Sequence, residues 1–248
     1  MRLRFVLGLM LVSVCAAPVV QAADVELVSS DKPVELVELF TSQGCSSCPP
    51  ADAWLSGLQR HPGLWRDFVP LAWHVDYWND LGWRDIFSSP AYSARQRAYQ
   101  AAGYLRTVYT PAVLVDGRPW RAWYTGRALP DAMSAPVGRL RLTIEGERVM
   151  LGFEPMHPAP AQTYRVHLAV LGMGYATPVG RGENSGRTLH EDFVVLAHHV
   201  SDSRRADAGL HWRMALPRVS AAQRLAVAAW VVGGSDPMPL QAVGGWLH

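Results

Sequence analysis

The feature that most constrains this fold is a pair of cysteines, Cys45 and Cys48, placed where an apolar run meets a helical pattern. Residues 33–40 (PVELVELF) form a short run rich in valine and leucine, which is typical of a strand buried on both faces. The residues after the cysteines space apolar side chains as a helix does and end at a Pro-Gly pair. A second apolar run, 68–78, follows. This order predicts a βαβ unit with both cysteines at its first turn.

The two cysteines allow three interpretations: a working dithiol, a metal site, or a structural disulfide. A helix N-terminus favours thiolate, because its unpaired N–H groups and its dipole carry partial positive charge. Cys45 is therefore the expected nucleophile, and Cys48, one turn further on and less exposed, is expected to resolve the mixed disulfide. Two thiolates alone suit Cu(I). A structural disulfide across so short a loop contributes only about 2 kcal/mol in the loop-entropy model.

The first 22 residues are predicted to be a secretory signal peptide. Arg2 and Arg4 precede an apolar stretch, and small residues lead to a cleavage site after Ala22. The apolar stretch is too short for a bilayer and no later segment is longer, so no membrane span is expected in the mature form. A lipid anchor on Cys15 is the alternative for this segment. We expect a periplasmic or secreted protein.

Charge gives no support to a nucleic acid or an anionic membrane as partner. The chain has 23 Lys or Arg and 21 Asp or Glu, and removing Arg2 and Arg4 with the leader leaves 21 of each sign. The expected partners are cysteine-containing envelope proteins or a redox partner, and the oligomeric state stays unknown. No cofactor and no metal are expected, because a dithiol carries the reducing equivalents itself.

After the βαβ unit the sequence predicts a helix, a hairpin and a short helix. Ser89 is a candidate cap for the first helix and Gly103 its stop. The hairpin covers 110–126 and contains an Asp-Gly turn. The short helix covers 127–134.

The sequence pattern changes at residue 139. Apolar and polar residues then alternate with a period of two, which predicts half-buried antiparallel strands of a β-sandwich. The predicted fold class is an α/β thioredoxin-like domain, residues 23–138, followed by an all-β sandwich domain, residues 139–248.

The α/β part of that prediction rests on a resemblance, since the element order of residues 34–135 resembles the thioredoxin fold. Proteins with that fold place a cis proline at the start of the strand facing the dithiol, where this chain has Thr110-Pro111. Many also bury a carboxylate in the strand before the cysteines, and Glu38 holds that position if the loop is one residue longer. The resemblance implies that Pro111 shapes the substrate groove and that Glu38 takes the proton of Cys48.

A closer resemblance is to a bacterial family of secreted, thioredoxin-like proteins classed as a domain of unknown function. It rests on the segments FTSQGCSSCPPAD, VDYWNDLGW, ARQRAY, YTPAVLVDG and RGENSG. It implies the fold, export and a dithiol, but no substrate. Gly44 stands where common thioredoxins usually have tryptophan, and Ser46-Ser47 separates the cysteines, so the redox direction is left open.

Several residues are candidates for a substrate groove or for contacts near the dithiol. Asp76 and Trp78 follow the second strand, whose C-terminal end lies beside the cysteine turn in a parallel sheet, and Thr110 precedes the proline. Ordinary loop packing is the alternative role for these residues. Arg181 and Glu183, in the loop RGENSG, are candidates for an interdomain contact near the dithiol.

The predicted function is an exported thiol-disulfide oxidoreductase that acts on protein cysteines through Cys45 and Cys48. The alternatives are a periplasmic Cu(I) carrier that uses the same cysteines and a non-catalytic interaction protein with a structural disulfide. With Cys45 as the helix cap, Pro49 and Pro50 predict a distorted first turn.

Overall fold

The computed structural model describes residues 24–130, 135–158, 162–205, 210–219 and 224–247. The predicted signal peptide, with its cleavage site at Ala22 and the alternative anchor Cys15, lies outside these residues. Residues 131–134 of the predicted short helix also lie outside them, and residues 127–130 are not helical. No helix in the described part of the chain is long and apolar enough to cross a membrane.

The segment around the cysteines forms the predicted strand, helix and strand. β2 (Glu35–Thr41) and β3 (Phe68–His74) are parallel neighbours, and every residue of both strands is buried. Between them lie α1 (Pro49–Gly57) and a 3-10 turn, η1 (Leu58–Arg60). Burial on both faces explains why these strands have continuous apolar sequences instead of alternating ones.

The next elements follow the predicted order only in part. α2 (Pro90–Ala101) begins as expected, because the Ser89 hydroxyl accepts a hydrogen bond from the Ala91 N–H. β4 (Ala112–Val115) and β5 (Arg118–Pro119) form a hairpin. The rest of the predicted hairpin is wrong: it is a 3-10 turn, η2 (Ala122–Thr125), whose Trp123 packs on Trp54 of α1.

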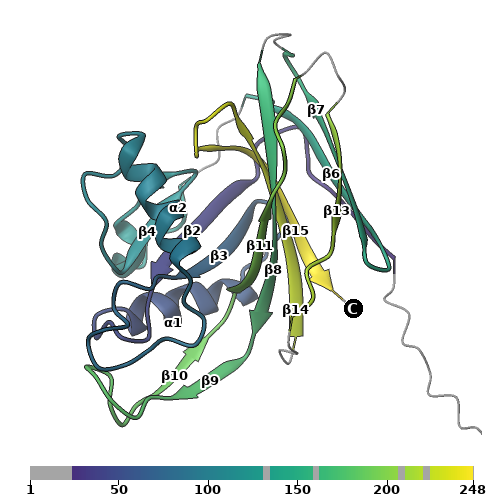
Figure 1. The fold of residues 1–248 in the computed structure, drawn as a ribbon. Helices are drawn as coiled ribbons and strands as arrows, with labels where there is room; N and C mark the ends of the chain where they lie inside the picture. The colour runs from purple at the N-terminus through teal and green to yellow at the C-terminus, as the bar shows by residue number, and fades with distance from the viewer. Residues whose placement is uncertain (1–23, 131–134, 159–161, 206–209, 220–223, 248) are drawn as a thin grey trace, which may run out of the picture.

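One large sheet joins both halves of the chain, in the strand order β15-β14-β8-β11-β3-β2-β4-β5 with β12 beside β8. Its strands from the second half are β8 (Thr163–Met173), β11 (Val194–Val200), β12 (Arg204–Arg205), β14 (Arg224–Gly233) and β15 (Pro239–Leu247). β11 and β3 are parallel neighbours. The predicted fold class, an α/β thioredoxin-like domain followed by a sandwich, is therefore wrong: the protein is mostly β-sheet, with two α-helices in its described residues (Figure 1).

The physical reason for this error is that a periodic pattern identifies a strand and its buried face but not its neighbour. β3 is buried along its whole length, as strands in the middle of a covered sheet are, and the first two residues of β11, Val194 and Val195, are buried too. Nothing in their composition shows that they share a sheet. The boundary near residue 138 stays a prediction, and it coincides with the first residue of a strand.

A smaller sheet has the order β1-β6-β7-β13 and packs on the large one. Its strands are β1 (Val25–Val28), β6 (Gly138–Glu145), β7 (Arg148–Pro155) and β13 (His211–Ala215). The predicted alternation is present in β6, where Leu140, Leu142 and Ile144 are buried. These side chains form a core with Val166 and Val227 of the large sheet.

A separate two-stranded sheet forms a hairpin between β8 and β11. β9 (Tyr175–Pro178) and β10 (Thr188–Glu191) are antiparallel, and the tip between them contains the loop RGENSG, residues 181–186. In Figure 1 this hairpin turns away from the large sheet and reaches toward α1. It therefore brings a segment of the second half of the chain to the cysteines.

Candidate functional site

Cys45 and Cys48 form a disulfide just before α1, with their Cα atoms 5.5 Å apart. The Cys48 N–H donates to the Cys45 carbonyl at 3.2 Å, which closes a turn ahead of the helix. Both cysteines are 0% exposed, whereas Ser46 and Ser47 between them are exposed. The expected difference in exposure between Cys45 and Cys48 is absent in this state, because both side chains are fully buried.

The helix begins later than the sequence suggests. Cys48, and not Cys45, is the residue before α1, so Pro49 and Pro50 occupy the first two helical positions. Proline is tolerated there because those positions have no helical acceptor for an N–H. The next two N–H groups, of Ala51 and Asp52, both donate to the Cys48 carbonyl. The first turn thus offers few unpaired N–H groups to a thiolate, and the Ser47 hydroxyl, 3.4 Å from the Cys45 sulfur, is a closer polar neighbour.

The tip of the β9–β10 hairpin covers the cysteine turn. The side-chain amide of Asn184 donates to the carbonyls of Gln43 and Cys45, at 3.0 Å each. Arg187 donates to the Asn184 amide oxygen at 2.8 Å and so fixes which end of the amide faces the turn. The Ser46 N–H donates to the Glu183 carboxylate at 3.0 Å. Glu183 therefore lies at the dithiol, where the sequence had suggested a contact.

Gln43 connects the cysteine turn to the hairpin and to the loop after β3. Its side-chain amide donates to Thr177 (3.1 Å) and Glu191 (2.8 Å) in the hairpin. Its amide oxygen accepts from the Trp83 indole at 3.1 Å, and its N–H donates to Asp85 at 2.8 Å. Each polar group of Gln43 has a partner, so this residue fixes the geometry of the turn from three directions.

A partly buried carboxylate, Asp52, lies one helical turn after Cys48. Residues four apart share a helix face, so its side chain is a neighbour of the Cys48 side chain. Burial raises the pKa of Asp52 to about 7, against the opposing effect of the nearby His74. A carboxyl group with a pKa near neutrality is able to give or take a proton at neutral pH.

His74 and Asp85 form a buried pair next to Asp52. Their side chains are 2.7 Å apart, from Nδ1 of His74 to Oδ2 of Asp85. Burial alone disfavours the charged imidazole, but the carboxylates around it, Asp85 first, raise the pKa of His74 to about 9. Nε2 of His74 and the hydroxyl of Thr41 are buried without a hydrogen-bond partner among the described residues.

Glu38 lies on the opposite face of the sheet from this cluster. It accepts hydrogen bonds from Trp73 (2.8 Å), Arg95 (2.5 Å) and Tyr99 (2.5 Å), of which the last two belong to α2. Side chains three positions apart in a strand point to opposite faces, so Glu38 and Thr41 cannot both face α1. The loop here is one residue longer than in the thioredoxin pattern, and this difference reverses the face toward which the Glu38 side chain points. Asp52, which follows Cys48 by four residues and lies near Thr41, is therefore the buried-side carboxylate at α1, and Glu38 is not.

The predicted groove residues Thr110, Pro111 and Trp78 lie together, whereas Asp76 has a different role. The Thr110-Pro111 peptide bond is cis. The Trp78 indole donates to the Thr110 hydroxyl at 2.8 Å, and a Cβ on Gly44 would lie 3.1 Å from the Trp78 Cβ. Trp78 therefore fills the space that a larger residue before Cys45 would need. Asp76 instead accepts a hydrogen bond from Ser93 and attaches the loop to α2.

Sequence reasoning missed most of the polar residues around the dithiol. Asp52 had a usable signal, since it is a carboxylate four residues after Cys48 on a predicted helix. Gln43 lies in the quoted segment FTSQGCSSCPPAD, but its partners are distant in sequence. Asp85, Asn184 and Glu191 are brought to the turn by long-range pairing that no local pattern shows.

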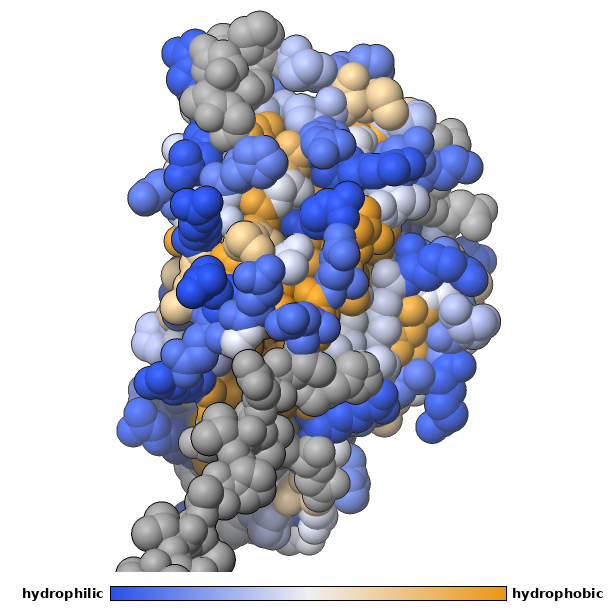
Figure 2. Space-filling view, turned by 90° about the vertical axis from the view of Figure 1, so that its right-hand side faces the viewer, coloured by the Kyte–Doolittle hydropathy of each residue, from blue (hydrophilic) through white to orange (hydrophobic). Residues whose placement is uncertain are grey.

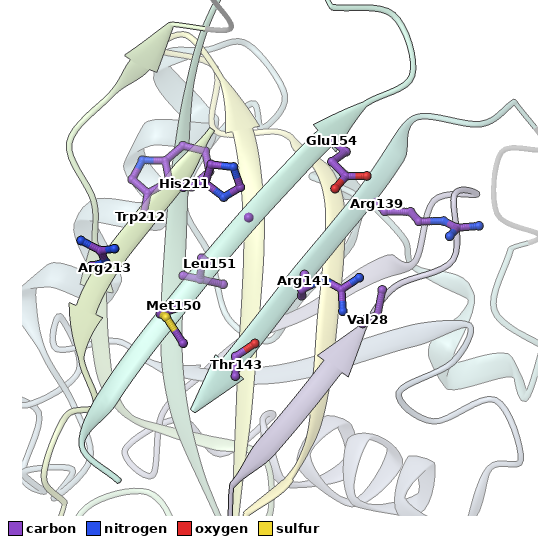
Figure 3. A pocket seen from close by; sticks show the side chains of 11 residues that line it. Val28, Arg139, Arg141, Thr143, Met150, Leu151, Glu154, His211, Trp212 and Arg213 are labelled. Carbon is purple, nitrogen blue, oxygen red and sulfur yellow. The ribbon is translucent and has the colours of Figure 1, made fainter. Parts of the chain in front are cut away.

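A cleft of about 340 Å³ lies on the outer face of the small sheet, away from the dithiol. Figure 2 shows apolar surface framed by hydrophilic side chains on this face. Figure 3 shows that Arg139, Arg141 and Arg213 at the cleft point in different directions, and Arg141 is already paired with Glu26. These side chains do not converge on one point. In the described residues, no group of three or more His, Cys, Asp or Glu is placed to hold a metal ion.

The fold and the site define a mostly β-sheet protein with a C-x-x-C disulfide buried beneath a hairpin. The chain belongs to the family described as protein of unknown function (DUF1223), whose family model matches residues 36–232. No curated protein matches.

Two solved structures are similar. The first is a crystal structure of a protein from Agrobacterium tumefaciens, with 24% identity, a TM-score of 0.56, and coverage of 88% of this chain and 96% of that one. The second is HBP35 of Porphyromonas gingivalis, with 14% identity, a TM-score of 0.52, and coverage of 88% and 76%. At these identities the likeness shows the fold alone.

Proposed function

We propose that this protein is an exported thiol-disulfide oxidoreductase that acts on cysteines of other envelope proteins. The observation that carries the proposal is Asp52, a carboxyl group with a pKa of about 7 that follows Cys48 by four residues, in the first turn of α1. A structural disulfide has no need of a proton donor that is ready at neutral pH. A dithiol that exchanges disulfides has such a need at every turnover.

In the oxidising direction, a partner thiolate attacks the Cys45 sulfur. A bond forms between the partner and Cys45, the Cys45–Cys48 bond breaks, and the electron pair leaves on Cys48. Asp52 in its acid form then gives Cys48 a proton. A second partner thiolate attacks the partner sulfur of the mixed disulfide and releases Cys45 as a thiolate. The partner loses two electrons, and the Cys45–Cys48 disulfide gains them and becomes a dithiol.

In the reducing direction the same steps run backwards. Cys45 attacks a partner disulfide, Asp52 takes the proton of Cys48, and Cys48 then attacks Cys45 to release the reduced partner. Thr110, Pro111 and Trp78 support this reading, because they form a partly exposed surface that packs on Gly44, the residue before Cys45. A partner chain bound there reaches the attacking sulfur over a short distance.

The test is a trapping experiment with Cys48→Ala, which removes the resolving sulfur. We expect mixed disulfides through Cys45 to accumulate with envelope proteins and to disappear on reduction. Cys45→Ala is the matched control, since it removes the attacking sulfur and leaves Cys48. The absence of adducts in Cys48→Ala under both oxidising and reducing conditions contradicts the proposal.

Complete burial of both sulfurs favours a second candidate, a non-catalytic protein with a structural disulfide. This candidate predicts that replacing both cysteines with serine changes only stability. The expected loss is about 2 kcal/mol in the loop-entropy model. A drop in melting temperature of roughly 4–8 °C, with no change in trapping or in the thiol state of envelope proteins, supports it.

A further inference from the structure

We infer that the β9–β10 hairpin, residues 175–191, is a hinged lid over the disulfide, held closed by Asn184. The biological role of this lid rests on the proposed function, since a lid over the disulfide matters only if the cysteines react. The access that the lid controls is tested separately: small reagents reach Cys45 and Cys48 only when the hairpin tip leaves the cysteine turn.

The first support is what covers the disulfide. Both cysteines are 0% exposed although Ser46 and Ser47, which lie between them, are exposed. The hairpin tip holds the turn by polar contacts: two hydrogen bonds from Asn184 and one to Glu183. These groups find water when the tip moves away, so opening exchanges hydrogen bonds and does not abolish them.

The second support is the small apolar contact at the tip. Gly182 lies against Gly82 and Trp83, and a Cβ on Gly82 would be only 3.3 Å from the Gly182 Cα. Two glycines in contact bury little apolar surface. The tip is therefore held mainly by hydrogen bonds, which contribute modestly to net stability. Behind the tip the hairpin buries Val179 and Leu189, and these two side chains are the apolar contact that opening must break.

The third support is the base of the hairpin, which has the features of a hinge. β9 and β10 pair only with each other in the described residues, so their movement breaks no ladder to the large sheet. It breaks the side-chain bonds from Gln43 to Thr177 and Glu191 instead. Gly174 and Phe193 flank the two strands, and both have left-handed φ angles, 72° and 56°. The Phe193 side chain is buried, and its ring centroid lies 5.9 Å from that of Trp65. This packing anchors the base of the hairpin.

The fourth support is free space beside this hinge. A cleft of about 560 Å³ lies against the hairpin base and is lined by Tyr175, Phe87 and Val195, among others. The Tyr175 ring at the start of β9 packs on Phe87, with 4.5 Å between ring centroids. The base is thus able to rotate toward the cleft without entering a packed core.

The test is the rate at which a water-soluble phosphine reduces the Cys45–Cys48 disulfide in the full chain. The phosphine gives two electrons to the disulfide, takes oxygen from water and leaves two thiols, so no protein partner is involved. We expect reduction in the folded wild type to be at least about 100-fold slower than in denaturant, because only the open fraction reacts. Asn184→Ala is expected to raise the folded-state rate about tenfold.

Ser185→Ala is the matched control, because among the described residues its hydroxyl bonds only the Gly180 carbonyl, within the tip. Its rate is expected to stay within about twofold of the wild type. Arg187→Ala is the second variant: it keeps Asn184 but removes the group that orients its amide, so a smaller rise in rate is expected. It keeps the test decisive if Asn184→Ala fails to fold.

Hydrogen exchange supplies an independent measurement. Amides of residues 181–191 are expected to exchange faster than those of β8 and β14 in the wild type, and faster still in Asn184→Ala. Equal reduction rates in Asn184→Ala and the wild type, or a folded wild type reduced as fast as the unfolded chain, overturn the lid. If the lid stands and Cys48→Ala traps nothing, the proposed oxidoreductase fails and the lid does not.

Discussion

The side-chain amide of Asn184 donates a hydrogen bond to the main-chain carbonyl of Cys45, 139 residues earlier in the sequence, at a distance of 3.0 Å. The same amide bonds the carbonyl of Gln43, whose side chain in turn bonds Glu191. The cysteine turn is thus held from the second half of the chain. The geometry of the disulfide and its exposure are properties of the whole protein and not of its first half.

Asp52→Asn is predicted to slow disulfide exchange and to change its pH profile. Asparagine has nearly the same shape but cannot take the proton of Cys48, and loss of general acid-base catalysis costs about 10²-fold or more. The rate of exchange with oxidised glutathione, measured from about pH 5 to pH 9, should lose an inflection near the Asp52 pKa of about 7. Asp67→Asn, which removes a surface carboxylate, is the control. An unchanged inflection in Asp52→Asn excludes Asp52 as the proton acceptor.

The same variant is predicted to be more stable than the wild type at alkaline pH. The folded-state pKa of Asp52, about 7, lies above the ordinary 3.8 because burial disfavours the charge. The folded state therefore holds the proton more tightly, and wild-type stability falls as pH rises from about 4 to about 7. Asp52→Asn lacks this penalty, so its melting temperature should match the wild-type value at pH 4 and exceed it at pH 8. The expected excess is roughly 2–4 °C for each kcal/mol of the penalty. Equal melting temperatures of the two proteins at both pH values contradict a raised pKa of Asp52.

The contrast between Glu38 and Asp52 shows how far sequence reasoning reaches at this site. Buried strands, the capped helix α2 and the cis proline position follow from local patterns and from resemblance. The face toward which a buried strand residue points does not follow from them, because a shift of one residue exchanges the two faces and both are buried here. Nor does the pairing of β11 with β3, since strand composition does not name a neighbour. The contacts of Gln43 with the β9–β10 hairpin depend on that pairing, so the sequence does not predict them either.

Glu38→Gln is predicted to destabilise the protein strongly without changing the chemistry of the dithiol. The change leaves Arg95 buried without its carboxylate partner, and removing one member of a buried ion pair costs about 3–5 kcal/mol. Urea unfolding should show this loss, while the exchange rate at low temperature stays within about twofold of the wild type. Glu26→Gln breaks an exposed pair with Arg141 and should cost less than about 1 kcal/mol. A pH-dependent loss of exchange in Glu38→Gln would return Glu38 to the role of proton acceptor.

The His74–Asp85 pair is predicted to make stability depend on pH above neutrality. The folded-state pKa of His74, about 9, lies above the ordinary 6.5, so the pair contributes fully below about pH 6.5. That contribution is lost as pH rises through about 9, and the free energy of unfolding should fall by about 1–3 kcal/mol. Asp85→Asn should remove this dependence and cost most at about pH 6, where His74 is charged. The measurement is the free energy of unfolding in urea at about pH 6 and pH 9.5. If it changes by the same amount between these pH values in the wild type and in Asp85→Asn, His74 is not charged in the folded protein.

Gly44→Ala is predicted to disturb the surface between the cysteine turn and the cis proline. Its new Cβ would lie 3.1 Å from the Trp78 Cβ and 3.4 Å from the Trp78 carbonyl, so Trp78 must move. That movement strains the hydrogen bond from Trp78 to Thr110, and overpacking of this kind costs about 1–3 kcal/mol. Gly57→Ala is the control, because a Cβ there meets nothing within 4 Å, and at the end of α1 it should be neutral or slightly stabilising, by up to about 1 kcal/mol. Thermal unfolding separates the two variants. If Gly44→Ala is as stable as Gly57→Ala, Trp78 does not fill the space beside the cysteines, and the absence of a tryptophan before Cys45 needs another explanation.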